Sequence, residues 1–397
     1  MDDTMPGDPA DRTSELRETV RSALDAAWVE TEGYTAPNSD VYPWLWLWDS
    51  CFHALVWERL GESARAVAEL TAALSTIDGA GFVPHMGYML DPDTSIELWG
   101  RRGSSSITQP PMFGHAIAEL HRRGVAVSSD VVDAATRGLR FLVERRARVD
   151  GLIEVVHPWE TGCDDSPRWD DLCPGDGFDI GRWRAFKVEV LDHIERGPAG
   201  EPLHNPAFAV GSAGFTALTV FNARELHEVT GDDVLLDGLD ALVAALDRRF
   251  DPDRRTWVDT GPAADGSGAI RTADGILPLL VTADVDAARR VVAELLDEDA
   301  YAGAYGPRGQ HVGEPTYDPL TYWRGGVWPQ LAYLVWVALR RGGHADAAEV
   351  VRTTTVDGAT TSGLAEYWDG ESGAGLGAIP QSWTGLVVLL DDAFSST

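Results

Sequence analysis

Apolar residues recur every three or four positions along most of this chain, and that spacing predicts amphipathic helices rather than strands. The first such run carries Leu16, Val20, Ala23, Leu24 and Ala27. Further helices are expected over residues 50–60, 62–77, 113–123, 129–149, 208–229, 232–246, 274–280, 284–296, 325–340, 344–353 and 383–391. Because no strand-like alternation is sustained, the pattern predicts an all-α protein, and only residues 256–258 suggest a short strand.

Glycines and short polar residues mark where these helices end and begin. Gly61, Gly124 and Gly231 follow apolar runs, and glycine readily adopts the left-handed backbone that closes a helix. Ser129 or Asp130 is expected to cap the run that reaches about residue 149, because a short side-chain oxygen can accept from the free N–H groups of a first turn.

The remaining connections are long and rich in tryptophan, glycine, proline and acids. They lie at about 32–48, 79–112, 150–178, 301–324 and 358–382. Long loops in a compact domain are usually functional. Helical hairpins with every second connection elaborated predict a closed ring of six hairpins, an (α/α)6 toroid with long loops at one mouth. An open α-solenoid is the alternative, but no repeat of fixed period supports it. We expect one domain over residues 1–397, with residues 1–11 as a flexible tail.

Residues 157–170 (HPWETGCDDSPRWD) contain four acids, two tryptophans, an arginine and a histidine. Two prolines and a glycine exclude a regular helix or a central strand through this segment. Its carboxylates could not fill a core, because they would need partners that the segment does not carry. Aromatic planes beside acids suit a sugar, which has apolar C–H faces and a polar hydroxyl rim. The segment therefore predicts half of a carbohydrate site.

Tryptophan placement supports the same interpretation, since at least nine of the fifteen tryptophans fall in the long connections or at their borders. Among them are Trp44, Trp46, Trp48, Trp159, Trp169, Trp323, Trp328, Trp368 and Trp383. A second acid, Glu366, lies in a downstream connection (GLAEYWD, residues 363–369). Hydrolysis of a glycosidic bond needs two carboxyl groups, one protonated and one ionised. Two acid-bearing loops at one mouth of a toroid would supply them.

Acidic residues outnumber basic ones by 63 to 32, which gives a formal net charge of −31. Such a surface repels nucleic acid and anionic membranes, so neither is an expected partner. Lys187 is the single lysine. An acidic surface with almost no lysine resembles that of proteins from salt-accumulating halophilic archaea, which predicts a high-salt cytosol. A GC-rich genome is the alternative explanation for arginine in place of lysine, but it leaves the excess of acids unexplained.

No apolar run reaches the length of about 18 residues that a transmembrane helix requires, and residues 1–4 do not resemble a secretory signal. A cytoplasmic location follows, in which cysteines stay reduced. The chain has three cysteines, Cys51, Cys163 and Cys173. Neither these cysteines nor His53, His85 and His115 show metal-ligand spacing. No metal and no cofactor are expected.

Residues 157–170 closely resemble the catalytic-acid loop of glycoside hydrolase family 63 and its relatives. The resemblance extends, in chain order, to residues 42–54 (YPWLWLWDSCFHA), 108–111 (TQPP), 322–330 (YWRGGVWPQ), 366–367 (EY) and 381–384 (QSWT). These segments span nearly the whole chain. The compact size is most similar to the mannosylglycerate/glucosylglycerate hydrolase branch, whose fold is an (α/α)6 barrel and whose members invert configuration. Trehalases and processing α-glucosidases are related.

The resemblance implies that Asp164, rather than its neighbour Asp165, is the general acid and that Glu366 is the general base. It also implies a set of sugar-binding residues: Tyr42, Trp46, Trp48, Asp49, Gln109, Trp159, Glu160, Trp323, Arg324, Tyr367, Gln381 and Trp383. For Asp49, a helix N-cap is a second interpretation. Arg168 suits either a structural ion pair or a ligand.

The resemblance implies an inverting hydrolase of a small α-linked glucoside or mannoside, such as glucosylglycerate, mannosylglycerate or a disaccharide like trehalose. Two departures keep the substrate open: Gly326 stands where relatives often carry proline, and Asp164-Asp165 replaces a common Asp-Asn. Three arginines are candidates for binding a glycerate carboxylate: Arg101, Arg182 and Arg184. The alternative functions are a non-hydrolytic sugar-binding toroid and a toroid phosphorylase or epimerase. The oligomeric state stays open.

Overall fold

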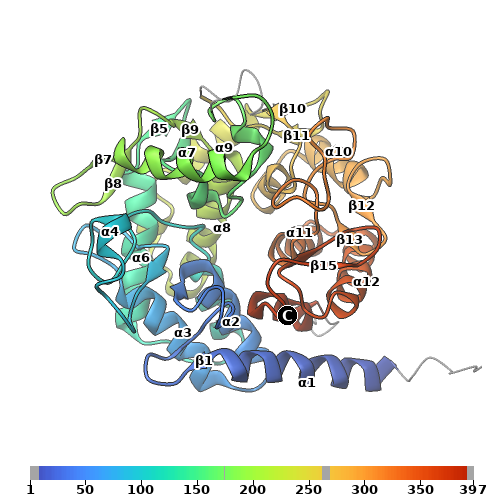
Figure 1. Ribbon diagram of the computed structural model, residues 1–397, viewed down its shortest axis with the longest axis horizontal. Helices are drawn as coiled ribbons and strands as arrows, with labels where there is room; N and C mark the ends of the chain where they lie inside the picture. Colours follow the sequence, from blue (N-terminus) through green and yellow to red (C-terminus); the bar gives the residue numbers. More distant parts are fainter. Residues whose placement is uncertain (1–8, 174, 262–268, 391–397) are drawn as a thin grey trace, which may run out of the picture.

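The computed structural model describes residues 9–173, 175–261 and 269–390, and the ribbon runs around a ring (Figure 1). The α-helices are α1 Pro9–Ala27, α2 Leu47–Arg59, α3 Ser63–Ser75, α4 Ile96–Trp99, α5 Phe113–Arg122, α6 Ser129–Glu144, α7 Ile180–Asp192, α8 Ala213–Thr230, α9 Leu239–Asp247, α10 Val285–Leu295, α11 Pro329–Arg341 and α12 Ala345–Thr361. The 3₁₀ segments are η1 Pro158–Thr161, η2 Pro167–Trp169, η3 Asp233–Leu235, η5 Ala273–Leu280 and η6 Ser382–Leu389.

The strands are short and pair locally, most of them at the ends of loops. They are β1 Trp28–Val29, β2 Tyr34–Thr35, β3 Leu45–Trp46, β4 Met86–Gly87, β5 Arg148–Val149, β6 Leu152–Val155, β7 Glu195–Arg196, β8 Pro202–His204, β9 Val210–Gly211, β10 Phe250–Asp251, β11 Thr256–Trp257, β12 Ala302–Gly303, β13 Gly306–Pro307, β14 Tyr367–Trp368 and β15 Gly375–Leu376. Every pairing among these strands is antiparallel, and β5–β6–β9 is the one sheet of three strands within the described residues. The strand expected at 256–258 is present as β11.

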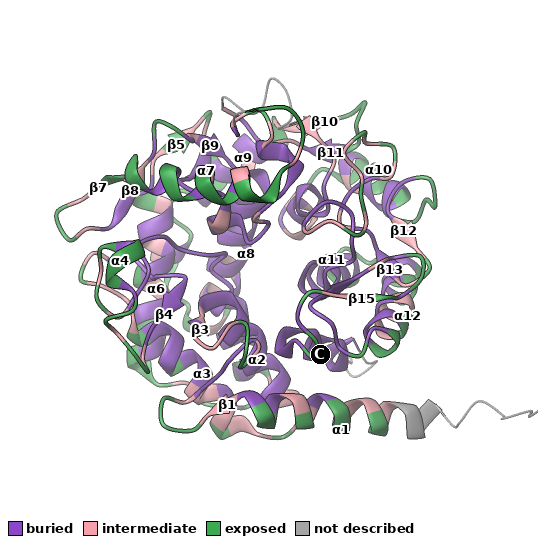
Figure 2. Ribbon diagram, viewed as in Figure 1, coloured by how far each residue is buried: buried purple, intermediate pink, exposed green. Residues whose placement is uncertain are grey.

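Within the described residues, six helical segments contact one another in a closed cycle. The order is α2, α5, α8, η5, α11 and η6, and η6 returns to α2. Outside this cycle, α1 lies on η6, α3 on α2, α6 and α9 on α8, and α12 on α11. Figure 2 shows the inner segments as buried and the outer helices with exposed faces. Elements from residue 47 to residue 389 thus form this inner cycle.

The sequences of the inner and outer helices explain their places. In α2 every residue from Leu47 to Trp57 is buried, and a helix that is buried all round belongs inside a protein. The same holds for α11 from Pro329 to Leu339. By contrast, α6 buries one face only, through residues such as Leu139 and Leu142.

Several predicted helix boundaries are wrong, and local chemistry explains the difference. Ser128, not Ser129 or Asp130, caps α6 by accepting from the N–H of Val131, and the helix ends at Glu144 because residues 148–149 pair with β6. Ser212 likewise caps α8, so residues 210–211 are strand instead of helix. The predicted start of α11 at 325 is also wrong, since the helix begins at Pro329, where proline has no N–H to leave unpaired.

Other segments differ from the prediction in type. The helix expected over 232–246 is divided into η3 and α9 by Gly238, whose φ is +81°. Residues 273–280 and 382–389 are 3₁₀ helices, and Pro278 inside the first removes a donor that an α-helix would need. Helix α7 was not predicted at all. Gly231 does end α8 in the left-handed region, as expected.

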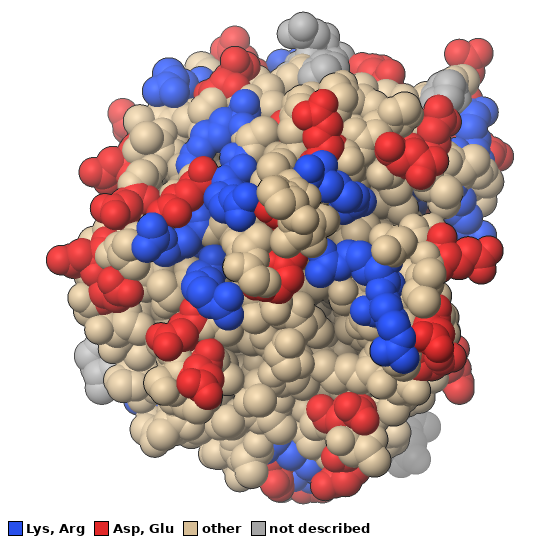
Figure 3. Space-filling view, turned by 90° about the vertical axis from the view of Figure 1, so that its left-hand side faces the viewer, with Lys and Arg blue, Asp and Glu red and all other residues tan. Residues whose placement is uncertain are grey.

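Residues 1–8 of the predicted tail lie outside the described residues, and α1 begins at Pro9. Among the helices that the structure describes, none is long and apolar enough to cross a membrane. On the face in Figure 3, arginine and acidic side chains are interspersed, with several arginines across the middle of the face. The high-salt environment stays a prediction.

Candidate active site

A cavity of about 690 Å³ collects residues from the long connections and from α7. Eleven of the residues singled out in the sequence line it: Tyr42, Trp46, Trp48, Asp49, Gln109, Trp159, Asp164, Trp323, Glu366, Gln381 and Trp383. Glu160, Arg324 and Tyr367 do not line it. The cavity therefore brings together acids and indoles that are separated by more than 300 residues in the chain.

Glu160 is buried beneath the cavity, where its carboxylate has all its partners within the protein. It accepts from Arg146 at 2.5 and 3.0 Å, and from the N–H groups of Thr108 at 3.1 Å and Val156 at 2.8 Å. A carboxylate with four such donors has no oxygen left for a sugar. Glu160 instead ties the acid loop, residues 157–170, to the segments on either side of it.

Arg324 also acts on the acid loop from outside the cavity. Its guanidinium holds both oxygens of Asp170, at 2.5 and 2.9 Å, and lies 4.0 Å from the centre of the Phe178 ring. Tyr367 backs an aromatic stack: it lies on Trp328 at 4.6 Å between ring centres, and Trp328 lies on Trp323 at 3.5 Å. Of these rings only Trp323 lines the cavity.

Backbone strain is found in the two connections that carry Tyr322 and Glu366. Trp323 has φ +60° and Leu364, two residues before Glu366, has φ +58°. Non-glycine residues in the left-handed region cost of order 1–3 kcal/mol and persist where the surrounding packing fixes them. Here the stacked rings hold Trp323 in place, and the strain at Leu364 precedes the turn that presents Glu366.

A buried ion-pair cluster fixes the far end of the acid loop. Arg168 is ion-paired with Asp259 and Asp274, and its Nε lies 3.1 Å from Ser166 Oγ. The guanidinium also lies 4.3 Å from the ring centre of Trp169. Since Arg168 is outside the cavity lining, the structural ion pair is the interpretation that fits it.

Gly162, just before Cys163 and Asp164, is required by close packing. Its φ is +74°, and a Cβ at this position would lie 2.3 Å from the indole of Trp48. The absence of a side chain lets the acid loop pass directly over Trp48. The carboxyl group of Asp164 therefore reaches the cavity wall formed by α2.

Asp164 has an environment that favours its protonated form. The pKa of Asp164 is raised to about 7, with burial as the largest cause; the ammonium of Lys187 acts in the opposite direction, and Asp165 and Glu366 contribute to the increase. A carboxyl group with a pKa near neutrality can serve as a proton donor at physiological pH.

Glu366 has a different environment, because three donors converge on it. Its Oε1 accepts from Tyr322 at 2.8 Å and Tyr42 at 3.2 Å, and its Oε2 accepts from the N–H of Ala378 at 2.9 Å. Burial raises the pKa of Glu366, and these hydrogen bonds oppose that shift. Gly377 makes room for the carboxylate, since a Cβ there would lie 2.4 Å from Oε2.

Asp49 is a third carboxyl group at the cavity. It does not cap α2, because the helix begins at Leu47 with Trp46 in the cap position. Burial raises the pKa of Asp49 well above its usual value, its own backbone N–H opposes this, and Glu366 and Asp164 add to the increase. With Asp165, four carboxyl groups line this one cavity, and such a set suits a ligand with many hydroxyl donors.

Arg184, one of the three arginines named for a glycerate carboxylate, also lines the cavity. Other cavity residues were missed or set aside in the sequence: Pro37, Val41, His85, Met86, Tyr88, Leu98, Trp99, Asp165, Ile180, Lys187, Tyr322 and Ala378, with glycines at 162 and 377. His85, which shows no metal-ligand spacing in the sequence, lines the cavity as a neutral ring: Nδ1 is bonded to Ser105 at 2.6 Å, and burial lowers its pKa to about 3. Trp99 was findable as a tryptophan in a long connection. It lies against Trp159 at 5.7 Å between ring centres.

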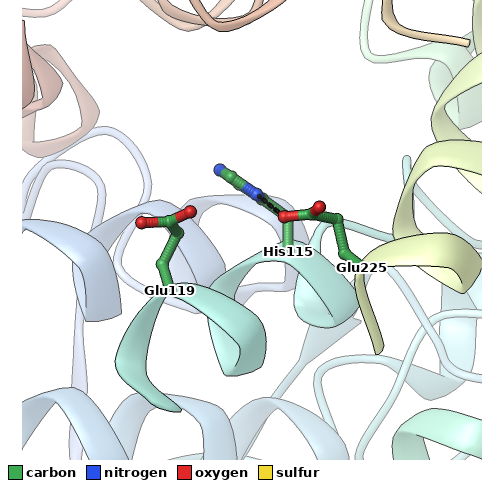
Figure 4. Close-up of side chains that lie close together, drawn as sticks. All are labelled: His115, Glu119 and Glu225. Atoms are coloured by element: carbon green, nitrogen blue, oxygen red, sulfur yellow. Dashed lines mark hydrogen bonds and ion pairs between the residues drawn. The ribbon is translucent and has the colours of Figure 1, made fainter. Parts of the chain in front are cut away.

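One cluster in the described part of the chain has the composition of a metal site: His115, Glu119 and Glu225 (Figure 4). Its ligand atoms are already engaged. His115 contacts Glu225 at 2.9 Å and the hydroxyl of Tyr333 at 2.9 Å. The carboxylates pair with two arginines, Arg122 and Arg341. The cluster therefore fits a buried ion-pair network between α5, α8 and α11.

Comparison with known proteins adds a family and a fold. The sequence model of one protein family, the mannosylglycerate hydrolase MGH1-like glycoside hydrolase domain, matches residues 42–384. The chain is 29% identical over 459 residues to a glucosylglycerate hydrolase of Mycolicibacterium hassiacum, covering 97% of this chain and 99% of that one. It is 26% identical over 404 residues to mannosylglycerate hydrolase MGH2 of Selaginella moellendorffii, covering 90% and 82%.

Among solved structures, a family 63 mannosylglycerate hydrolase of Thermus thermophilus, in complex with Tris and D-glycerate, superposes with a TM-score of 0.81. Its sequence is 22% identical, and the match covers 94% of this chain and 99% of that chain. The two chains therefore share a fold over nearly their full lengths.

Proposed function

The chain belongs to the mannosylglycerate hydrolase MGH1-like family of glycoside hydrolases, and from that premise we propose that it is an inverting α-glycosidase built on an (α/α)6 toroid. Its substrate is a small α-linked glucoside or mannoside, and α-glucosylglycerate or α-mannosylglycerate is the best fit. Asp164 is the general acid and Glu366 the general base.

One observation carries this proposal: Asp164 and Glu366 line the same cavity with different hydrogen-bond surroundings. Burial raises the pKa of Asp164 to about 7, so the group can hold a proton. Glu366 accepts from two phenols and a backbone N–H, and these donors favour its ionised form. Glycoside hydrolysis requires one carboxyl group of each kind.

The reaction then follows from these two environments. Asp164 donates its proton to the glycosidic oxygen as the bond to the anomeric carbon breaks. Glu366 takes a proton from a water molecule that attacks the anomeric carbon from the opposite face, which inverts the configuration. Burial raises the pKa values of Tyr42 and Tyr322, so both phenols stay protonated and hold Glu366 in one orientation. Asp49 accepts from sugar hydroxyls.

We assign the glycerate carboxylate to Arg184. Helix α7 presents Ile180, Arg184 and Lys187 to the cavity at helical spacing. The other two candidate arginines point elsewhere. Arg182 donates to the backbone carbonyls of residues 176 and 177, and Arg101 pairs with Asp78 at 3.5 Å. The relatives are named for glycerate glycosides, whose aglycone carries a carboxylate, and Arg184 is an exposed cation at this cavity that could pair with it.

Replacing Arg184 with glutamine is expected to raise KM for a glycerate glycoside by about 10- to 100-fold, the value of a charge-assisted hydrogen bond. kcat should change little, and KM for an α-glucoside with a neutral aglycone should stay the same. Arg182→Gln on the same helix serves as the matched control. An equal loss on charged and neutral aglycones would remove Arg184 from this role.

The proposed function itself is tested by proton NMR of the first product. α-Glucosylglycerate, α-mannosylglycerate and trehalose are each incubated with the protein, with and without phosphate and in dilute and molar KCl. We expect the β-anomer of the free hexose to appear first from a glycerate glycoside, without any need for phosphate. The α-anomer as first product would exclude inversion. Cleavage of trehalose alone would move the substrate to the disaccharides, and a requirement for phosphate would indicate a phosphorylase.

A further inference from the structure

The single lysine of the chain, Lys187, lies in the candidate active site. All the other residues among the 32 Lys and Arg of the chain are arginines. Lys187 is on α7, is 5% exposed and lines the cavity. Its ammonium lies 2.5 Å from Oδ1 of Asp165 and 5.4 Å from the ring centre of Trp159. In addition, Nε2 of His157 lies 2.8 Å from the backbone oxygen of Lys187, which fixes α7 against the acid loop.

We propose that Lys187 is a positioning residue that acts through Asp165: its ammonium pairs with the Asp165 carboxylate, so that the proton for the leaving group stays on Asp164. This inference rests on the proposed role of Asp164 as the general acid. It adds two residues, Lys187 and Asp165, that set where the proton resides.

The need for such a residue follows from the chain itself. Asp164 and Asp165 are consecutive carboxyl groups that both line the cavity, and Asp165 is 2% exposed. Two carboxyl groups this close in a desolvated site compete for one proton. A proton on Asp165 would be lost to catalysis if Asp164 faces the glycosidic oxygen. An ammonium ion in contact with one of the two removes the competition.

The choice of lysine is itself informative in a chain that otherwise uses arginine. An ammonium is a compact point charge, whereas a guanidinium presents five N–H donors in a planar fork. In a pocket formed by Asp165 and the indole of Trp159, a single carboxylate oxygen is a better match for an ammonium than for a guanidinium. A guanidinium would leave more of its N–H donors without a partner. A buried donor without a partner is destabilising, which disfavours arginine at this position.

The charged groups around Asp164 determine the direction in which each substitution should shift its pKa. Lys187 faces it from α7, Asp165 from its own loop, and Glu366 from the opposite connection. Asp49 on α2 and Arg184 on α7 also line the cavity, and Arg168 with Asp259 and Asp274 lies behind Cys163. After burial, Lys187 is the leading influence and lowers the pKa of Asp164, whereas Asp165 raises it. Removing the cation and removing the anion should therefore act in opposite directions.

The test is the pH profile of kcat/KM for Lys187→Met, Asp165→Asn and the double variant, with Arg182→Gln as control. In Asp165→Asn the alkaline limb of the profile should shift to lower pH by about 1 unit, which lowers kcat/KM at pH 7 about fivefold. In Lys187→Met the alkaline limb should shift to higher pH by about 1 unit. The double variant should return close to the parent profile. Thermal melts check folding, and Asp165→Asn with the double variant carries the test if Lys187→Met does not fold.

Two results would overturn the inference: alkaline limbs that stay in place in every variant, or single variants whose limbs move in the same direction. A purely structural pair would lower activity at all pH values without opposite shifts. Failure of the proposed function looks different, because Asp164→Ala would then hydrolyse the glycoside at the parent rate. The two failures are therefore distinguishable with the same substrate and assay.

Discussion

Asp164→Ala is expected to lower kcat for an α-linked glycerate glycoside by roughly 10²–10⁴-fold, the usual contribution of a general acid. An α-glycosyl fluoride should lose far less, because fluoride leaves without protonation. This contrast separates loss of the acid from loss of the fold. Asp176→Ala, an exposed acid of the same connection, is the matched control and should change neither rate. Full turnover of the glycerate glycoside by Asp164→Ala would exclude the assignment.

The same group sets the expected pH dependence. A general acid works only while it is protonated, and burial raises the pKa of Asp164 to about 7. Activity should therefore be present below pH 7 and fall as the pH rises through this value. In Asp164→Ala acting on the fluoride, this alkaline limb should be absent. The acid-side limb, which belongs to ionisation of Glu366, should remain in both proteins.

The general architecture could be predicted from the sequence because it depends on local signals. Helical periodicity located α2, α3, α5 and α10, and Gly231 marked the end of α8. Long connections and their tryptophans located the cavity, since loops that cannot pack into a core must carry their polar groups to a surface or a site. These signals come from neighbouring residues in the sequence, so they can be recognised without knowing the fold.

Helix α7 was missed because its buried face is interrupted by a charge. Trp183, Val190 and Leu191 are buried at helical spacing, but the position between them on that face is Lys187. Ile180, in contrast, is 43% exposed and faces the cavity. A helix that presents one side to a polar cavity gives no clean apolar periodicity. The lone lysine was the available signal, and its meaning depends on Asp165, which only the fold places beside it.

Glu160 and Arg324 show what a motif cannot decide. Both belong to segments that resemble catalytic loops, and both support the cavity from behind, through Arg146 and Asp170 respectively. Sequence places a polar residue in a functional segment, but the direction of its side chain depends on partners far away in the chain. Charged pairs between distant loops are therefore the part of the site that required the structure.

Glu366→Ala is expected to lower kcat by roughly 10²–10⁴-fold on the glycerate glycoside and also on the α-glycosyl fluoride, because both reactions need an activated water. This pattern differs from that of Asp164→Ala, which spares the fluoride. Azide should restore part of the fluoride turnover in Glu366→Ala, since an anionic nucleophile needs no base and the lost side chain leaves space for it. The product should be the β-glycosyl azide, which NMR identifies.

The structure makes this variant a clean test, because the donors to Glu366 remain satisfiable. Tyr42 and Tyr322 line the cavity and can donate to solvent or to azide once the carboxylate is gone. Glu371→Ala, whose side chain is 54% exposed on the same connection, is the matched control and should keep the parent rate. An α-glycosyl azide would mean attack from the same face as the leaving group. Such retention needs a covalent intermediate on another group, because this variant has no carboxylate at 366, so Glu366 would be a bystander and the catalytic carboxylate would have to be sought at Asp49, another carboxyl group of the cavity.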